Sequence, residues 1–468
     1  MVAALTACGG RAERRGDTVL FASGADLQSI NPLLTVHPLA RQVQKHLLLT
    51  TLARYDSTLR PVPYLATWSW SADQTTLTFR IRPGVRWHDG RRTTARDAAW
   101  TLNTARDVVT GYPRQNDLAG ISFVDVRDDS TLVVEFTTPQ SGLPDVFTDL
   151  AILPAHLLDT VPPAALRRAP WNSAPVGNGP FRYVAHEPNR RWVFAADSNF
   201  PAILGGPPAL DRIIIVVVDE PLTKLAALSS GELDFAGINP AHAAFVRRDP
   251  RLAVLDYPLL FTYGVVFNTR RPPLDDVRVR RAVSLALDRQ EVVDGYLFGF
   301  GTPAGGPVPD GVPGGQPAPV PSPDTAAARA LLAGRDVRFE LLTVGSGEAA
   351  LEQLIQAQLA RAGIRVTIRQ LELSAFLDRV YGARHDFDAA VMGIPGDLGL
   401  GYLGPLLSLA GVPTTTDPRL AQRRFADAMP VAFLYHTRGV QGMNRRVEGV
   451  TMDLRGELVT AARWRIRP

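Results

Sequence analysis

The sequence predicts an α/β protein that folds into at least two lobes and carries additional β-hairpins. The chain has 468 residues, which is more than one hydrophobic core usually organises. Two separate segments, 213–235 and 337–370, have the strand–helix–strand pattern of a βαβ unit. Nearer the N-terminus, in the span 77–136, alternating apolar and polar residues are interrupted by turn residues, which is typical of hairpins.

The first hairpin is expected between Leu77 and Trp87. Apolar and polar residues alternate from Leu77 to Arg82, which is the period of a half-buried strand. Pro83-Gly84 favours a turn, after which the alternation resumes as far as Trp87. A second hairpin is expected over 121–126 and 132–136.

A helix is expected between the two hairpins, from Thr94 to Ala105. Asp97 stands three residues after Thr94, so the pair forms an acidic version of a capping box. The apolar residues Trp100 and Leu102 continue the helix.

The two βαβ units differ in how deeply their strands are expected to be buried. Ile213 to Val218 is an unbroken β-branched run, which predicts a strand buried on both faces of a parallel sheet. A helix over 220–229 and a strand over 233–235 complete that unit. The second unit consists of a strand, a helix and a returning strand, over 337–341, 351–362 and 364–368, with Gly363 ending the helix. Between the units, the Gly- and Pro-rich stretch 299–324 predicts a surface loop.

Composition and spacing argue against several classes of function. Fifty basic and forty-six acidic residues are interspersed, whereas a nucleic-acid-binding protein concentrates its basic residues on one surface. No two of the eight histidines fall at i, i+3 or i, i+4 spacing, which disfavours a metal site. Gly345-Ser346-Gly347 lacks the Gly-x-Ser-x-Gly pattern of a nucleophile elbow, and no phosphate-binding loop occurs. We therefore expect no enzyme activity, no metal and no cofactor.

The single cysteine, Cys8, lies in the sequence Leu5-Thr6-Ala7-Cys8, which resembles a bacterial lipobox. The resemblance implies that Cys8 is diacylated and anchors the protein to a membrane, with 1–16 as signal remnant and tether. The alternative is an N-terminal tail without function. No other stretch approaches the roughly 18 to 20 apolar residues of a spanning helix, so the lipid would be the only membrane attachment.

A wider resemblance is carried by several collinear segments. The first comprises Leu65-Ala66-Thr67-Trp68, the span from Leu77 to Gly90 and the span from Thr94 to Ala98. Further segments are Pro175-Val176-Gly177-Asn178-Gly179-Pro180-Phe181, Phe267-Asn268-Thr269, 272–282, Ala286-Leu287-Asp288-Arg289 and 349–370. Together they resemble the family 5 solute-binding proteins, which are the oligopeptide-, dipeptide- and nickel-binding proteins of ABC importers.

This resemblance implies the type II periplasmic-binding-protein fold, with two α/β lobes, a cleft between them and an extra β-hairpin-rich domain. It assigns lobe I to 17–50, 172–267 and 437–468, the extra domain to 51–171 and lobe II to 268–436. The segment 391–397 lacks a tryptophan that the family often has. The span from Ala410 to Ala432 is short, so one or more helices of lobe II are expected to be missing.

The resemblance also implies candidate ligand-binding residues. Asp397 is expected to hold the α-ammonium group of a peptide through a charge-assisted hydrogen bond; the alternative is an aspartate that only stabilises a turn. Tyr263, Tyr435 and His37 are further candidates for the pocket. The alternative for the tyrosines is a place in the core with a satisfied hydroxyl group.

The implied function is capture of a peptide or a related small solute outside the cytoplasm and its delivery to an importer. The expected partners are the solute, the permease and ATPase subunits, and the membrane through the lipid anchor only. We expect a monomer that binds no nucleic acid, in the periplasm or on the outer cell surface. The alternatives are a solute sensor of the same fold without transport and an extracellular hydrolase.

Overall fold

The computed structural model describes residues 17–35, 37–316, 318–345, 347–415 and 417–467. Cys8 and the expected tether 1–16 lie outside these residues, so the lipid anchor stays a prediction. No helix within the described ranges is long and apolar enough to cross a membrane.

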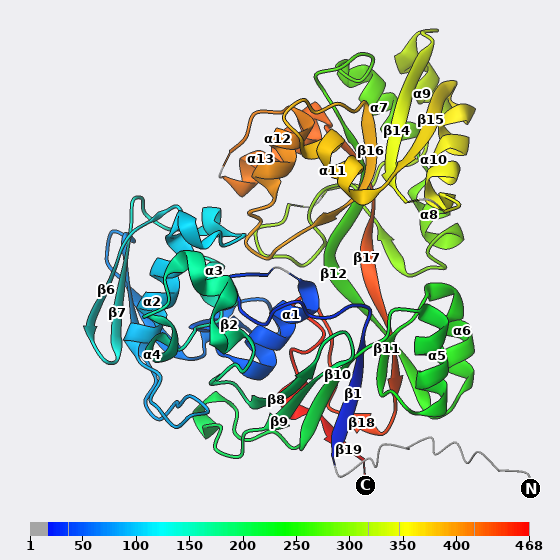
Figure 1. The fold of residues 1–468 in the computed structure, drawn as a ribbon. Coiled ribbons are helices and arrows are strands. Elements are labelled where there is room, and N and C mark those ends of the chain that lie inside the picture. Colours follow the sequence, from blue (N-terminus) through cyan, green and yellow to red (C-terminus); the bar gives the residue numbers. More distant parts are fainter. Residues whose placement is uncertain (1–16, 36, 317, 346, 416, 468) are drawn as a thin grey trace, which may run out of the picture.

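An eleven-stranded mixed sheet extends through both ends of the molecule (Figure 1). The strand order is β15-β14-β16-β12-β17-β11-β1-β10-β9-β8, and β13 pairs with β17 outside this path. In chain order these strands are β1 (Thr18–Ser23), β8 (Phe181–Glu187), β9 (Arg191–Ala196), β10 (Arg212–Val217), β11 (Phe235–Gly237), β12 (Leu252–Phe267), β13 (Gly301–Pro303), β14 (Val337–Val344), β15 (Ile364–Leu371), β16 (Ala389–Pro395) and β17 (Val431–Asn444).

The long strands β12 and β17 connect the upper and lower parts of the molecule in Figure 1. They pair antiparallel, from Leu252 opposite Asn444 to Val266 opposite Val431. The pairing is irregular between Pro258 and Thr262, near the middle of β12. An irregular two-stranded connection bends more easily than a wide, regular sheet.

The upper body consists of β13–β16, the adjoining ends of β12 and β17, and seven helices. These are α7 (Val277–Ala286), α8 (Arg289–Gly295), α9 (Thr325–Leu332), α10 (Ala350–Arg361), α11 (Leu373–Tyr381), α12 (Leu403–Ala410) and α13 (Pro418–Ala428). Helices α7–α10 and α11–α13 pack on separate cores. Val265 belongs to the first core and its neighbour Val266 to the second, because successive side chains of a strand point to opposite faces.

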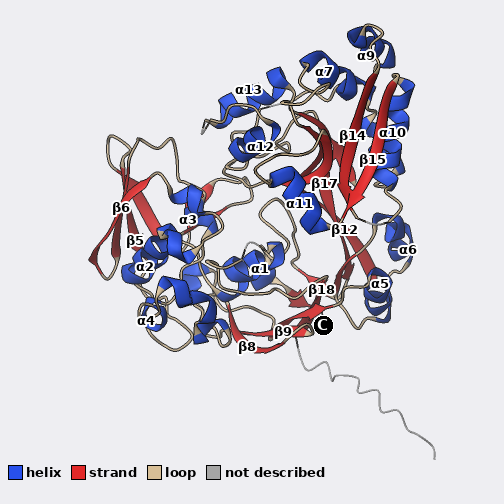
Figure 2. Ribbon diagram, turned by 45° about the horizontal axis from the view of Figure 1, so that its top comes forward, coloured by secondary structure: helices blue, strands red, loops and turns tan. Residues whose placement is uncertain are grey.

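The lower body contains β1 and β8–β11 with α1 (Pro38–Val43), a π-helix (Gln44–Leu48), α5 (Pro221–Ser230) and α6 (Ala243–Arg248). A side body is attached to it (Figure 2). The side body is a four-stranded sheet of order β4-β5-β7-β6 with three helices. Its elements are β4 (Ala66–Trp70), β5 (Thr76–Ile81), β6 (Ile121–Asp128), β7 (Thr131–Phe136), α2 (Ala95–Arg106), α3 (Val146–Asp149) and α4 (Ala155–Leu158). There are also two small hairpins, β2 (Ala53–Tyr55) with β3 (Pro61–Pro63) and β18 (Val447–Glu448) with β19 (Arg465–Ile466).

Several sequence predictions are confirmed. The expected helix is α2, which begins after Thr94, and Thr94 N donates to Oδ2 of Asp97 at 2.8 Å. The second hairpin is β6–β7. The C-terminal βαβ unit is β14–α10–β15 with parallel strands, and Gly363 after the helix has a φ of 83°. A positive φ is readily adopted by glycine, which explains the residue at this position.

Three predictions are corrected. The first hairpin is wrong, because β5 pairs with β4 and β7 and not with the segment that contains Val85 and Trp87. Those two side chains are instead buried in the core shared by the lower and side bodies. Strand β10 is parallel to β1 but antiparallel to β9, and it is only half-buried. The stretch 299–324 contains β13 and contributes buried residues, such as Val308, to the core under α11–α13.

The span from Ala410 to Ala432, near which one or more helices are expected to be missing, contains a helix. It accommodates α13, directly after α12, and Phe425 of α13 is buried in the core of the upper body. The short span therefore does not leave this side of the upper body uncovered. The expected domain limits within 17–468 stay a prediction.

Candidate functional site

The resemblance-bearing segment 175–181 packs against the end of the π-helix and the residues that follow it. Gly179 N and Asn178 N both donate to the carbonyl oxygen of Leu48, at 2.8 and 3.1 Å. The Asn178 side chain accepts from Thr50 N at 2.9 Å. A Cβ atom on Gly177 would lie 2.0 Å from that Leu48 oxygen, so only glycine fits. These contacts fix the π-helix, and with it the basic residues described below.

Asp397 lies in the loop that follows β16. The loop is anchored where Gly396 N donates to the carbonyl oxygen of Leu260 at 2.8 Å. Within the loop, Oδ1 of Asp397 accepts from Gly401 N at 3.1 Å. Asp397 therefore stabilises a turn, as its alternative interpretation predicts.

Two glycines of this loop bring it against the side body. A Cβ atom on Gly399 would lie 2.8 Å from Cβ of Asp145, closer than real Cβ atoms approach. A Cβ atom on Gly401 would lie 3.5 Å from Oδ1 of Asp117 and 3.7 Å from Oδ2 of Asp397. At this contact, Asp397 of the upper body therefore lies near Asp117 and Asp145 of the side body. Asp397 thus stabilises a turn and also lies between two bodies.

A cluster of seven charged side chains surrounds the contact, and we refer to it as the charged cluster. Its members are Arg41, Lys45, Arg114, Asp117, Asp145, Asp149 and Asp397. They come from three parts of the fold: α1 and the π-helix, the side body, and the loop after β16.

Asp149 is the centre of the ion pairs. Its carboxylate lies 2.7 Å from Nη1 of Arg114 and 3.1 Å from Nζ of Lys45, and Nη2 of Arg41 also reaches it. Burial alone would raise the pKa of Asp149, but the charges of Lys45, Arg41 and Arg114 outweigh burial and hold the pKa far below its usual range. Asp149 is therefore a fixed anion that positions three cations.

Arg114 connects Asp149 with the other carboxylates. Its Nη2 lies 2.6 Å from Oδ2 of Asp117 and 3.3 Å from Oδ2 of Asp145. Burial opposes the charge of Arg114, but Asp149, Asp145 and Asp117 outweigh it and raise its pKa. The charge of Arg114 also lowers the pKa of Asp397, so the two side chains interact across the contact between the bodies.

The pKa values of Asp397 and Asp117 are raised, whereas that of Asp149 is lowered. Burial raises the pKa of Asp397, and the charges of Asp145 and Asp117 raise it further, against the opposing effect of Arg114. Burial also raises the pKa of Asp117, again against Arg114. The three cations of the cluster balance the carboxylates of the side body, so the charge of Asp397 is in excess. One added cation, such as an ammonium group, would neutralise it.

The structure brings Tyr263 and Tyr435 together, but not into the charged cluster. They are cross-strand partners on β12 and β17, and their rings stack with centroids 5.1 Å apart. Tyr435 is 2% exposed and belongs to the core under α7–α10. Burial raises the pKa of both phenols, and the charge of Glu352 adds to the effect. Tyr263 is half-buried, so of the two it has more surface to offer a ligand.

His37 caps a helix. Its Nδ1 accepts from Ala40 N at 3.3 Å at the start of α1. Burial lowers the pKa of His37, and the charge of Asp26 opposes the shift only in part. The ring is therefore neutral at pH 7. Ligand binding by His37, as by Asp397, Tyr263 and Tyr435, stays a prediction.

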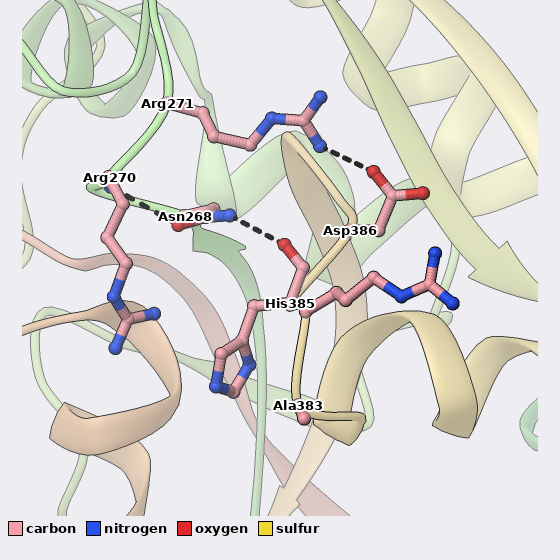
Figure 3. A pocket seen from close by; sticks show the side chains of 7 residues that line it. Asn268, Arg270, Arg271, Ala383, His385 and Asp386 are labelled. Carbon is pink, nitrogen blue, oxygen red and sulfur yellow. Dashed lines mark hydrogen bonds and ion pairs between the residues drawn. The ribbon is translucent and has the colours of Figure 1, made fainter.

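A surface hollow of about 610 Å³ lies at the other end of β16 (Figure 3). Asn268 at its base donates to the carbonyl oxygens of His385 and Phe387, both at 2.9 Å, and Arg271 pairs with Asp386 at 2.9 Å. Strand β16 has seven residues, so about 20 Å separate this hollow from Asp397. Asn268, part of a resemblance-bearing segment, therefore stabilises a loop and does not contact the charged cluster.

Sequence reasoning missed most of the charged cluster, although a signal was present. Arg41 and Lys45 are four residues apart, and so are Asp145 and Asp149. Residues at this spacing lie on one face of a helix, which predicts a basic face and an acidic face. The sequence alone does not show that the two faces meet. Among the described residues, no group of three or more His, Cys, Asp or Glu side chains is placed to hold a metal ion.

Comparison with known proteins places these features in context. The sequence profile of the bacterial extracellular solute-binding proteins, family 5 (middle part), matches residues 60–408. A putative ABC transporter peptide-binding protein of Brucella ovis is 29% identical over 321 residues, which span 66% of this chain and 60% of that protein. The chain thus aligns with less than two thirds of that relative's length. A probable di/tripeptide-binding protein of Pseudomonas aeruginosa is 29% identical over 421 residues, or 83% of this chain and 78% of that protein.

A solved structure with the same fold is that of the oligopeptide-binding protein AppA from Bacillus subtilis in complex with a nonapeptide. It superimposes with a TM-score of 0.78 at 21% identity and covers 96% of this chain and 99% of that chain. The fold is therefore the type II periplasmic-binding-protein fold, with two α/β lobes, an interlobe cleft and an extra β-hairpin-rich domain.

Proposed function

This chain belongs to the bacterial extracellular solute-binding proteins of family 5, and from that premise we propose that it captures peptides by their N-terminal ammonium group. The peptide would lie between the upper body and the lower and side bodies and would be handed on unchanged. The relatives named as peptide-binding proteins support a peptide as the ligand.

The observation that carries the proposal is the excess charge of Asp397. Its carboxylate lies at the contact between two bodies, next to Asp117 and Asp145, and its pKa is raised by burial and by these neighbours. A carboxylate in this environment gains more from a bound ammonium group than an exposed carboxylate would, because water competes less for it.

The same charges couple binding to closure. When the bodies are closed, Asp397 faces the carboxylates of Asp117 and Asp145, and their repulsion opposes closure. An ammonium group placed among them replaces repulsion by attraction, so the ligand stabilises the closed arrangement more than the open one. A ligand shifts a conformational equilibrium only through such a difference in affinity. The irregular segment of β12 near Pro258 provides the bend.

Delivery requires partners that this chain does not supply. We propose that the closed, loaded form docks on the permease of an ABC importer, whose ATPase is a separate subunit. Membership of an extracellular solute-binding family supports a location outside the cytoplasm. Attachment through a lipid on Cys8, a monomeric state and the absence of enzymatic activity belong to the same proposal.

Isothermal titration calorimetry with matched peptides tests the proposal. Trialanine and N-acetyl-trialanine differ only in the charge and size of the N-terminus, so we expect binding of the first and little or none of the second. Replacing Asp397 by Asn should weaken trialanine binding about tenfold to hundredfold, the range expected for a lost charge-assisted hydrogen bond.

A matched control is Asp386→Asn, which removes an aspartate from the hollow at the far end of β16. It should leave the affinity unchanged. Equal binding of the acetylated and the free peptide, or an Asp397→Asn variant with full affinity, would refute the ammonium site. If no peptide of two to eight residues binds, the peptide assignment itself is wrong.

A further inference from the structure

Gln44 has a buried amide group without a partner. The residue is 3% exposed, and its Nε2 forms no hydrogen bond with any described residue. Gln44 begins the π-helix, and its main-chain oxygen accepts from Leu49 N at 2.8 Å, so the backbone there is fixed. A buried amide without a hydrogen-bond partner destabilises a protein, and π-helical turns are frequent at functional sites.

Gln44 lines a small cavity beside the charged cluster. The cavity holds about 10 Å³, room for one oxygen-sized group. Its walls are formed by Pro32, Thr35, Arg41, Gln44, Tyr112, Arg114, Asp149 and Leu150. Arg114 is thus common to this cavity and to the surroundings of Asp397.

The residues that line the cavity carry several hydrogen-bond donors. Nε2 of Gln44 is one, and the guanidinium groups of Arg41 and Arg114 are others. Tyr112, which also lines the cavity, is 6% exposed. Burial raises the pKa of Tyr112, so the hydroxyl keeps its proton and can donate. The one carboxylate in the wall, Asp149, is already paired with three cations. The missing group is therefore an acceptor.

Charge decides which acceptor fits. One ammonium group neutralises the excess charge of Asp397, so a second ligand group bearing a negative charge would restore an imbalance in a buried place. A neutral acceptor does not. In a peptide, the neutral acceptor next to the N-terminal ammonium group is the carbonyl oxygen of the first residue.

We propose that Gln44 and the cavity form a subsite for the first carbonyl oxygen of the bound peptide, with Nε2 of Gln44 as the donor. The inference rests on the proposed function and makes it more specific. The ligand class becomes peptides with an ordinary first peptide bond, and an N-terminal γ-linkage, which places a carboxylate beside the ammonium group, is disfavoured.

A double-mutant cycle between protein and ligand tests this subsite. The protein change is Gln44→Met, which keeps the shape of the side chain and removes the donor. The ligand change is a thioamide at the first peptide bond of trialanine, which replaces the acceptor oxygen by a larger, weaker acceptor without changing the charge. For the wild-type protein we expect the thioamide to bind about three- to tenfold more weakly, the range for one neutral hydrogen bond. In Gln44→Met this difference should fall below about twofold, because the two changes remove the same contact.

Two controls separate the possible outcomes. Gln42→Met alters the same residue type two positions earlier, outside the cavity wall, and should preserve the discrimination. A thioamide at the second peptide bond should change the affinity relative to trialanine by the same factor in Gln44→Met and in the wild type. Thermal unfolding of each variant shows whether it is folded.

The subsite is refuted if Gln44→Met weakens binding of the oxo- and thio-peptides by the same factor, because the cavity then holds only a water molecule. If the variant does not fold, a crystal structure of the wild-type complex decides. It supports the subsite when the first carbonyl oxygen lies within hydrogen-bonding distance of Nε2, and refutes it when a water molecule or nothing lies there. Failure of trialanine to bind the wild-type protein would instead contradict the proposed function.

Discussion

The hydroxyl group of Thr262 lies 2.8 Å from Nδ1 of His436, and this contact joins the two strands that connect the upper and lower bodies. Burial lowers the pKa of His436 to about 4, and the charge of Asp310 opposes the shift only in part. A histidine in the unfolded chain has a pKa near 6.5. Between about pH 6.5 and pH 4, His436 is therefore protonated in the unfolded chain but neutral in the folded chain.

This difference predicts a pH-dependent stability. The contribution of His436 is fully present above pH 6.5 and is lost as the pH falls towards 4, because protonation then favours the unfolded state. We expect His436→Gln to make the free energy of unfolding less dependent on pH in this window. Urea unfolding at pH 4.5, 5.5 and 7 checks it, with His242→Gln as the control. A His436→Gln profile parallel to that of the wild type would contradict the expectation.

Peptide affinity should depend on pH through Asp397. The ionised carboxylate binds the ammonium group, so a proton on Asp397 competes with the ligand. Because the pKa of Asp397 is raised above its ordinary value of 3.8, affinity should begin to fall at a higher pH than for an ordinary aspartate. The ammonium group of the peptide, with a pKa near 8, sets the upper limit. Calorimetry between pH 4 and pH 9 should give a bell-shaped affinity, and Asp397→Asn should lack its acidic limb.

Gly177→Ala should destabilise the protein. The added Cβ atom would lie 2.0 Å from the Leu48 carbonyl oxygen, which is backbone and accepts hydrogen bonds from Asn178 N and Gly179 N. Such overpacking costs about 1–3 kcal/mol or more. Gly142→Ala, where no atom lies within 4 Å of the added Cβ, is the matched control. Equal urea midpoints for the two variants would show that the 47–49 backbone yields more easily than the packing indicates.

Arg289→Met should also destabilise the protein, without an effect on the charged cluster. The residue is 2% exposed, and its guanidinium group donates to the carbonyl oxygens of Ala304, Phe433, Ser284 and Leu287. Burial lowers the pKa of Arg289 to about 10, which still leaves it charged at neutral pH. Its removal leaves several buried carbonyl oxygens without a hydrogen-bond donor, each at a cost of about 1–3 kcal/mol. The exposed Arg278→Met is the control, and trialanine affinity of folded Arg289→Met should stay within about twofold of wild type.

The local elements were predictable because their determinants are local. Thr94 and Asp97 predict the start of α2, and the alternation on both sides of the turn near Asp128 predicts β6–β7. The prediction failed for 77–87, because alternation shows that a segment is a strand without showing its partner. Strand β5 pairs with β4, which precedes it, and with β7, some fifty residues later.

The sequence by itself determined the fold class and family, the βαβ units, the helices α2, α5 and α10 and the choice of Asp397 as a candidate, because periodicity, caps and collinear segments are written within short stretches of chain. Only the tertiary structure decided what surrounds Asp397. Asp117 and Asp145 face it across the contact, and Gln44 is left with an unpaired amide. These relationships depend on how distant segments pack, since the charge and burial of a group are set by neighbours in space.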